Sequence, residues 1–97
     1  METMTFEYPG KDPVAHRAHV GLVGSGDLEV LLEPASNDVA TVQVCTSVDG
    51  YGKIWKAVLD RFFAKHSAKA FIEINDFGAT PGMVAFRLEQ ALEESRS

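Results

Sequence analysis

The sequence contains little cysteine and little positive charge, and these two shortages limit what the chain can be. Cys45 is the only cysteine, so an internal disulfide is excluded, which fits a reducing compartment such as the cytoplasm. Lys and Arg total 9 against 14 Asp and Glu, which gives a net charge of −5 and a pI near 5.0. The basic residues are scattered. No nucleic-acid partner is expected, because phosphate binding needs clustered positive charge.

Long apolar runs are also missing. No stretch approaches the roughly 20 apolar residues that cross a bilayer, and residues 1–5 lack a basic region followed by an apolar one. We therefore expect no membrane association, no export signal and a cytoplasmic location. With 97 residues, 45% apolar and 24% charged, the chain fits a single domain over residues 1–97. We expect residues 93–97 to fray.

Apolar residues that alternate with polar ones predict strands in the first half of the chain. The predicted strands cover residues 4–8, 17–23, 28–32 and 39–48, with a loop at 11–15 and a turn at 34–38, and a fifth strand follows at 70–74. In the fourth strand, Val42, Val44 and Thr46 are expected to share one face. Cys45 stands among these valines and is expected to be a buried small residue.

The apolar spacing changes to that of an amphipathic helix after residue 53. Ser47 or Asp49 is expected to cap this helix. The spacing is that of Ile54, Trp55, Val58, Leu59, Phe62 and Phe63. Four of these residues form a stripe that is expected to be core rather than a cofactor site: Trp55, Leu59, Phe62 and Phe63. A second helix opens at Thr80-Pro81 and ends near Glu94. The fold class is therefore α+β, a mainly antiparallel sheet of about five strands with two helices packed on one face, in the order strand, strand, strand, strand, helix, strand, helix.

A serine between two glycines is the most unusual local feature. The glycines Gly21, Gly24 and Gly26 have the spacing GxxGxG, and a strand pattern follows them, which argues against a nucleotide-binding loop. The segment is better interpreted as a hairpin tip that presents Ser25 to a modifying enzyme, with Gly24 and Gly26 supporting the turn. Asp27 could accept a backbone hydrogen bond there. The alternative interpretation is an ordinary turn.

A second motif spans residues 75–82. It is interpreted as a strand-to-helix turn, with Gly78 at positive φ and Thr80 as the helix cap. The alternative is that backbone amides at this helix end hold a ligand or a partner, with Asp76, Gly78, Thr80 and Gly82 as candidate contacts.

Catalytic and metal sites are not expected. The three histidines lack the spacing of a metal site: His16, His19 and His66. The surroundings of Ser25 do not match the GxSxG pattern of a hydrolase nucleophile.

The run VGLVGSGDLEVLLEP at residues 20–34 and the run INDFGATPG at residues 74–82 resemble the acyl-carrier (delta) subunit of malonate decarboxylases. The resemblance covers nearly the whole chain, and a looser one exists to the gamma subunit of citrate lyase. It implies a non-catalytic carrier whose matching serine, Ser25, bears 2'-(5''-phosphoribosyl)-3'-dephospho-CoA through a phosphodiester.

The resemblance further implies that acetyl and malonyl are carried as thioesters while malonate is converted to acetate and CO2. It implies partners: an acyl-transferase alpha subunit, decarboxylase beta and gamma subunits, a prosthetic-group transferase and a malonyl transferase. Two alternatives stay open, a small docking domain that carries nothing and the carrier subunit of citrate lyase.

Overall fold

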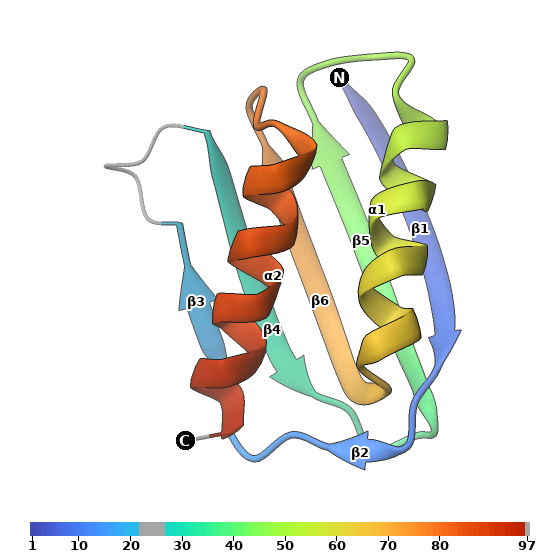
Figure 1. Ribbon diagram of the computed structural model, residues 1–97, viewed down its shortest axis with the longest axis vertical. Coiled ribbons are helices and arrows are strands. Elements are labelled where there is room, and N and C mark those ends of the chain that lie inside the picture. Colours follow the sequence, from blue (N-terminus) through green and yellow to red (C-terminus); the bar gives the residue numbers. More distant parts are fainter. Residues whose placement is uncertain (22–26, 97) are drawn as a thin grey trace.

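The computed structural model describes residues 1–21 and 27–96 as six strands and two helices. The elements in chain order are β1 (Glu2–Pro9), β2 (Asp12–Pro13), β3 (Ala18–Val20), β4 (Leu28–Pro34), β5 (Val39–Thr46), α1 (Gly52–Lys65), β6 (Ala68–Asp76) and α2 (Pro81–Arg96). The α+β class is confirmed, with both helices in front of one face of the sheet (Figure 1).

The sheet is mixed, with the strand order β1-β5-β6-β4-β3. Three neighbouring pairs are antiparallel, whereas β5 and β6 run parallel because α1 crosses between them (Figure 1). The short β2 pairs with the start of β6, in the segment where the sequence predicted only a loop. Two residues of extended backbone give too short a pattern to be recognised in the sequence.

The core lies between the sheet and the helices. Every second residue is buried throughout β5 and β6 and in β4 as far as Leu32, so each of these strands contributes one face to the core. The predicted face of β5 is confirmed, since Val42, Val44 and Thr46 are all buried. Cys45 points to the other face and is only partly buried, so the prediction of a buried thiol is wrong. The period of two in a strand separates it from the valines on either side of it.

Both predicted helices are present, but α1 begins differently from the prediction. Tyr51 occupies the cap position and makes no side-chain capping hydrogen bond. The carboxylate of Asp49 instead pairs with the chain's amino terminus at 3.4 Å, so the prediction of a Ser47 or Asp49 cap is wrong. The predicted core stripe of α1 is confirmed, since its four residues are all buried: Trp55, Leu59, Phe62 and Phe63. Ile54, which shares the helical spacing, is 44% exposed.

The second helix begins as predicted and ends later than predicted. The hydroxyl Oγ1 of Thr80 accepts a hydrogen bond from the Met83 amide at 3.2 Å, and Pro81 is the first helical residue. The helix then continues to Arg96, and Ser95 is fully buried with its carbonyl accepting the amides of Ala15 and His16. These bonds hold residues 93–96 in the helix, where the sequence predicted fraying of residues 93–97, and Ser97 lies outside the described residues.

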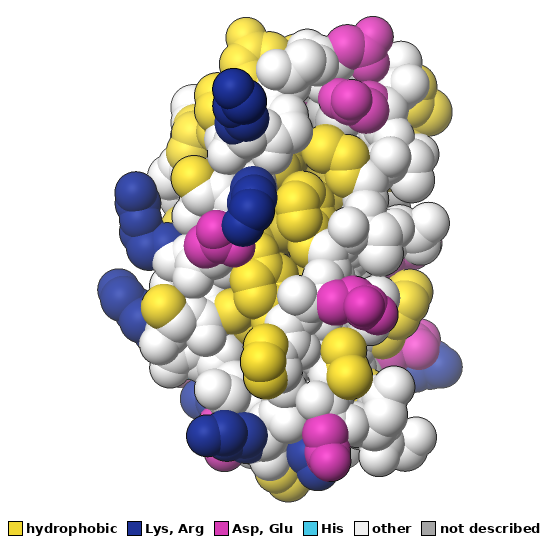
Figure 2. Space-filling view, turned by 90° about the vertical axis from the view of Figure 1, so that its right-hand side faces the viewer, with side chains coloured by type: hydrophobic (Ala, Val, Ile, Leu, Met, Phe, Trp, Pro, Cys, Tyr) yellow, Lys and Arg dark blue, Asp and Glu magenta, His cyan; other side chains and the backbone are white. Residues whose placement is uncertain are grey.

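Strand β1 forms one edge of the sheet, beside α1. Figure 2 shows this side of the molecule, where hydrophobic side chains form a band next to Lys and Arg side chains. The partly buried Met4, Phe6 and Tyr8 of β1 pack against the core here. The Tyr8 ring stacks on Phe63 with centroids 4.4 Å apart, which ties the edge strand to the helical layer.

Candidate functional site at the ends of β4, β5 and β6

The two sequence motifs lie side by side in the fold, although about fifty residues separate them along the chain. Strand β4 carries the end of the first motif and pairs antiparallel with β6, which leads into the second. Leu28 pairs with Asp76, and Glu29 pairs with Asn75. The amide of Phe77 donates a 2.8 Å hydrogen bond to the Asp27 carbonyl. The glycine-rich segment and the turn before α2 therefore belong to one end of the molecule.

Gly21 closes the base of the glycine-rich segment. Its φ is +75°, and a Cβ added to it would lie 2.1 Å from the carbonyl oxygen of Leu28. A side chain cannot be accommodated at that distance, so the close approach of the backbone at residue 21 to the Leu28 carbonyl requires glycine. The predicted pair of strands on either side is confirmed, because β3 and β4 pair antiparallel from Ala18↔Leu32 to Val20↔Val30.

Ser25, Gly24 and Gly26 lie outside the described residues, whereas their neighbour Asp27 is described. Asp27 is half-buried, and its Oδ1 is buried without a hydrogen-bond partner among the residues that the structure describes. A buried carboxylate oxygen without a partner is costly. This oxygen is available to accept a hydrogen bond at the start of β4.

Polar side chains extend from this base over the open face of the sheet. Oε1 of Glu29 accepts a hydrogen bond from the Asn75 side chain at 2.8 Å, and its Oε2 lies 2.9 Å from Nε2 of His19. The Asn75 hydrogen bond, followed by that of His19, lowers the pKa of the Glu29 carboxyl below its usual value. Glu29 is therefore a carboxylate at neutral pH, fixed between β3 and β6.

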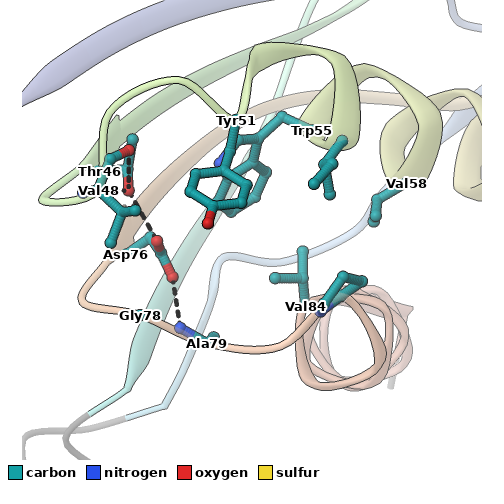
Figure 3. Close-up of a pocket in the computed structure, with 11 residues that line it drawn as sticks. Thr46, Val48, Tyr51, Trp55, Val58, Asp76, Gly78, Ala79 and Val84 are labelled. Carbon is teal, nitrogen blue, oxygen red and sulfur yellow. Dashed lines mark hydrogen bonds between the residues drawn. The ribbon is translucent and has the colours of Figure 1, made fainter.

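A pocket of about 340 Å³ opens beyond the carboxyl ends of β5 and β6, between the first turns of α1 and α2 (Figure 3). Its walls are mostly apolar, with Trp55 and Val58 from α1 facing Val84 from α2. Crevices beyond the carboxyl ends of parallel strands are frequent ligand sites, since helix amino ends and loops meet there.

Asp76 forms the polar floor of this pocket. Its Oδ2 accepts a 2.7 Å hydrogen bond from the Thr46 hydroxyl, and its Oδ1 accepts one from the Ala79 amide at 2.9 Å (Figure 3). The same Thr46 oxygen accepts the Val48 amide at 3.0 Å. Asp76 is 4% exposed, so these bonds satisfy a nearly buried carboxylate and fix both turns against each other.

The structure separates the four candidate contacts of the second motif. Asp76 and Gly78 line the pocket, and Gly78 has the predicted positive φ, at +106°. Thr80 caps α2, and Gly82 is not among the lining residues. The sequence interpretation missed Tyr51 and treated Trp55 as core alone. The position of Trp55, the chain's single tryptophan, near a helix start was the available signal.

Neither a metal cluster nor a membrane helix is found within residues 1–21 and 27–96. No three His, Cys, Asp or Glu side chains there are grouped closely enough to hold an ion. Neither helix is long and apolar enough to cross a bilayer.

Fold and site together define a small two-layer α+β domain whose two unusual motifs meet at one end of the sheet. Residues 15–95 match the sequence profile of the malonate decarboxylase delta subunit (MdcD) family. The chain belongs to this family.

Two relatives, both named malonate decarboxylase acyl carrier protein, show the extent of the similarity. The protein of Pseudomonas aeruginosa strain UCBPP-PA14 is 57% identical over 96 residues, which is 98% of this chain and 97% of the relative. That of Azotobacter vinelandii strain DJ is 54% identical over 95 residues, covering 97% and 96% of the two chains.

A solved structure has the same fold. It is a chain in the crystal structure of a Pseudomonas malonate decarboxylase hetero-tetramer in complex with malonate. The TM-score is 0.89 at 50% sequence identity, and the match covers 97% of this chain and 98% of that chain.

Proposed function

We propose that this chain is the acyl carrier subunit of a malonate decarboxylase and that Ser25 is the attachment point of its covalent arm. Family membership carries this proposal: the matched region, residues 15–95, includes Ser25 and both motifs. The relatives named acyl carrier protein match over nearly their whole length, which supports a single carrier domain. Such a subunit presents a group to other active sites and is not itself an enzyme.

The residues at the base of the segment fit a covalent attachment. The backbones at Gly21 and Leu28 are so close that a Cβ on Gly21 would lie 2.1 Å from the Leu28 carbonyl oxygen. The segment that bears Ser25 therefore starts from a fixed base. The buried Oδ1 of Asp27 has no partner among the described residues and would accept a backbone amide of that segment. Gly24 and Gly26 would complete the turn.

The proposed arm is 2'-(5''-phosphoribosyl)-3'-dephospho-CoA, joined to Ser25 through a phosphodiester. Its terminal thiol would hold acetyl or malonyl as a thioester. The complex would convert malonate to acetate and CO2. The chain contributes the tether. A tethered group reaches each partner at a high effective concentration, and no binding step from solution is needed.

The solved relative comes from a hetero-tetramer, which supports membership of a multi-subunit assembly. The partners that we propose are an acyl-transferase alpha subunit and the decarboxylase beta and gamma subunits. A prosthetic-group transferase would load the arm and a malonyl transferase would serve it. We propose a cytoplasmic location, which the single cysteine fits.

The test is the intact mass of the chain purified from its native cells during growth on malonate. We expect an increment equal to the arm, mapped by fragmentation to Ser25. The variant Ser25→Ala should lack the increment and keep its fold, because at the hairpin tip that the sequence predicts such a change shifts stability by less than about 0.5 kcal/mol. The exposed turn residue Ser36 provides the control, since Ser36→Ala should be loaded like the parent chain.

Two results would count against the proposal. An unmodified mass in cells that consume malonate would remove the carrier role and leave a docking domain. An arm that persists on Ser25→Ala would move the attachment to another residue.

A further inference from the structure

The pocket between the two helices has a shape and polarity that suit one end of a small molecule. Its volume of about 340 Å³ lies at the lower end of the range for ligand sites. Tyr51 and Ile54 at its rim are 47% and 44% exposed, so the opening itself is apolar. The pocket could therefore hold a short apolar group, whereas a whole nucleotide arm would not fit.

Charge narrows the choice of occupant. Among the described residues that line the pocket, Asp76 is the one charged side chain, and no Lys or Arg lines it. Both Asp76 oxygens already accept hydrogen bonds, one from the Thr46 hydroxyl and one from the Ala79 amide. A phosphate or a second carboxylate would be repelled by the Asp76 carboxylate, and no basic side chain lines the pocket to offset this repulsion. A neutral group is favoured.

The pocket lies near the segment that would bear the arm, so the arm itself is a source of such a neutral group. Gly78 and Ala79, in the turn before α2, line the pocket. The same turn is hydrogen-bonded to the residue that follows the arm-bearing segment, because the Phe77 amide donates to the Asp27 carbonyl at 2.8 Å. The pair Glu29 and Asn75 joins the same two strands again at 2.8 Å. A group tethered to this segment would start from the same end of the molecule as the pocket, so binding it there would cost less entropy than binding a free ligand.

We propose that the pocket lined by Trp55, Val58, Asp76 and Val84 is the resting site of the acetyl-thioester end of the carrier's own arm. This inference rests on the proposed function. The acetyl group is neutral and small enough for the apolar walls, whereas the free carboxylate of a malonyl group would be repelled by Asp76. Exchange of acetyl for malonyl would then release the arm from its own domain toward the partner that removes CO2.

The test uses the acetylated, arm-bearing chain, with its loading established first by intact mass. The rate at which neutral hydroxylamine cleaves the thioester reports how exposed the thioester is, and the fluorescence of Trp55 reports occupation of the pocket. Ile54→Glu puts a charge on the exposed rim of the pocket. Ala57→Glu is the matched control, an exposed position on the same helix that does not line the pocket.

We expect the thioester of the parent chain and of Ala57→Glu to be cleaved about fivefold more slowly than that of Ile54→Glu, which corresponds to roughly 1 kcal/mol of lost binding. The Trp55 emission of the loaded and unloaded chains should differ in the parent and agree in Ile54→Glu. With malonyl in place of acetyl, the parent and Ile54→Glu should be cleaved at the same rate as each other.

Equal cleavage rates in all three acetylated proteins, with the arm present by mass, would overturn the pocket proposal and leave the carrier function intact. A chain without any arm would overturn both. If Ile54→Glu fails to fold by circular dichroism, Val48→Glu takes its place, since Val48 lines the pocket and is 36% exposed.

Discussion

Gly21 illustrates how much a single backbone position decides at this site. The sequence drew attention to Gly24 and Gly26 because they flank a serine, whereas Gly21 stood out only as a member of an imperfect glycine pattern. Its role depends on the Leu28 carbonyl, which approaches from across the strand pair. Contacts of this kind between residues seven apart arise from strand pairing and cannot be inferred from composition.

We expect Gly21→Ala to lower the free energy of unfolding by about 1–3 kcal/mol, because alanine would be strained at positive φ and would meet the Leu28 carbonyl. Urea denaturation measures the change. Gly82→Ala is the control: its Cβ would meet nothing within 4 Å in the first turn of α2, so stability should be equal or up to about 1 kcal/mol higher. Equal stability of Gly21→Ala and the parent would refute this account.

The elements themselves were largely predictable, and the errors occurred at their ends. Apolar periodicity located β1, β4, β5, β6 and both helices. It could not locate the cap of α1, because Gly50 and Tyr51 extend the connection before the helix begins, and Gly50 adopts a φ of +87°. Thr80 was predicted correctly as a cap, since its hydroxyl and Pro81 form a local signal that needs no tertiary contact.

The first turn of α1 contains no acidic residue, and it carries the exposed Lys53, whose positive charge opposes the helix dipole. We expect Lys53→Glu to raise the free energy of unfolding by roughly 0.3–1 kcal/mol. The identical change at the other end, Lys65→Glu in the last turn, should lower it by a similar amount. Chemical denaturation at low and high salt measures both effects, and both should shrink as salt rises. Shifts of the same sign in the two variants would contradict a dipole origin.

At the scale of the whole molecule, the order of strands was the part that the sequence concealed. Alternation identifies which face of a strand is buried, but not which strand lies beside it. The chain places β6 in the middle, antiparallel to β4 and parallel to β5 and β2. The predicted antiparallel arrangement therefore holds for three of the five strand pairs among the described residues. This arrangement brings residues 27–29 against residues 75–77, and the pocket at this end therefore required the structure.

The edge strand β1 is joined to the helical layer through Tyr8, whose hydroxyl donates a 2.6 Å hydrogen bond to Asp60 of α1. Burial, and then this bond to Asp60, raises the pKa of the Tyr8 hydroxyl well above its ordinary value of 10.0. The unfolded chain therefore loses the Tyr8 proton at a lower pH than the folded chain does. The stabilisation is fully present below about pH 10 and is lost as the pH rises further.

We therefore expect the free energy of unfolding of the parent to fall more between about pH 9 and pH 11 than that of Tyr8→Phe, which lacks the titrating group. Lysine titration is common to both proteins and cancels in the difference. Urea denaturation at the two pH values measures it, and Tyr51→Phe, at an exposed tyrosine outside this contact, should behave like the parent. Equal losses in the parent and Tyr8→Phe would mean that the edge strand is held to α1 by the stacking of Tyr8 on Phe63 and not by its hydroxyl.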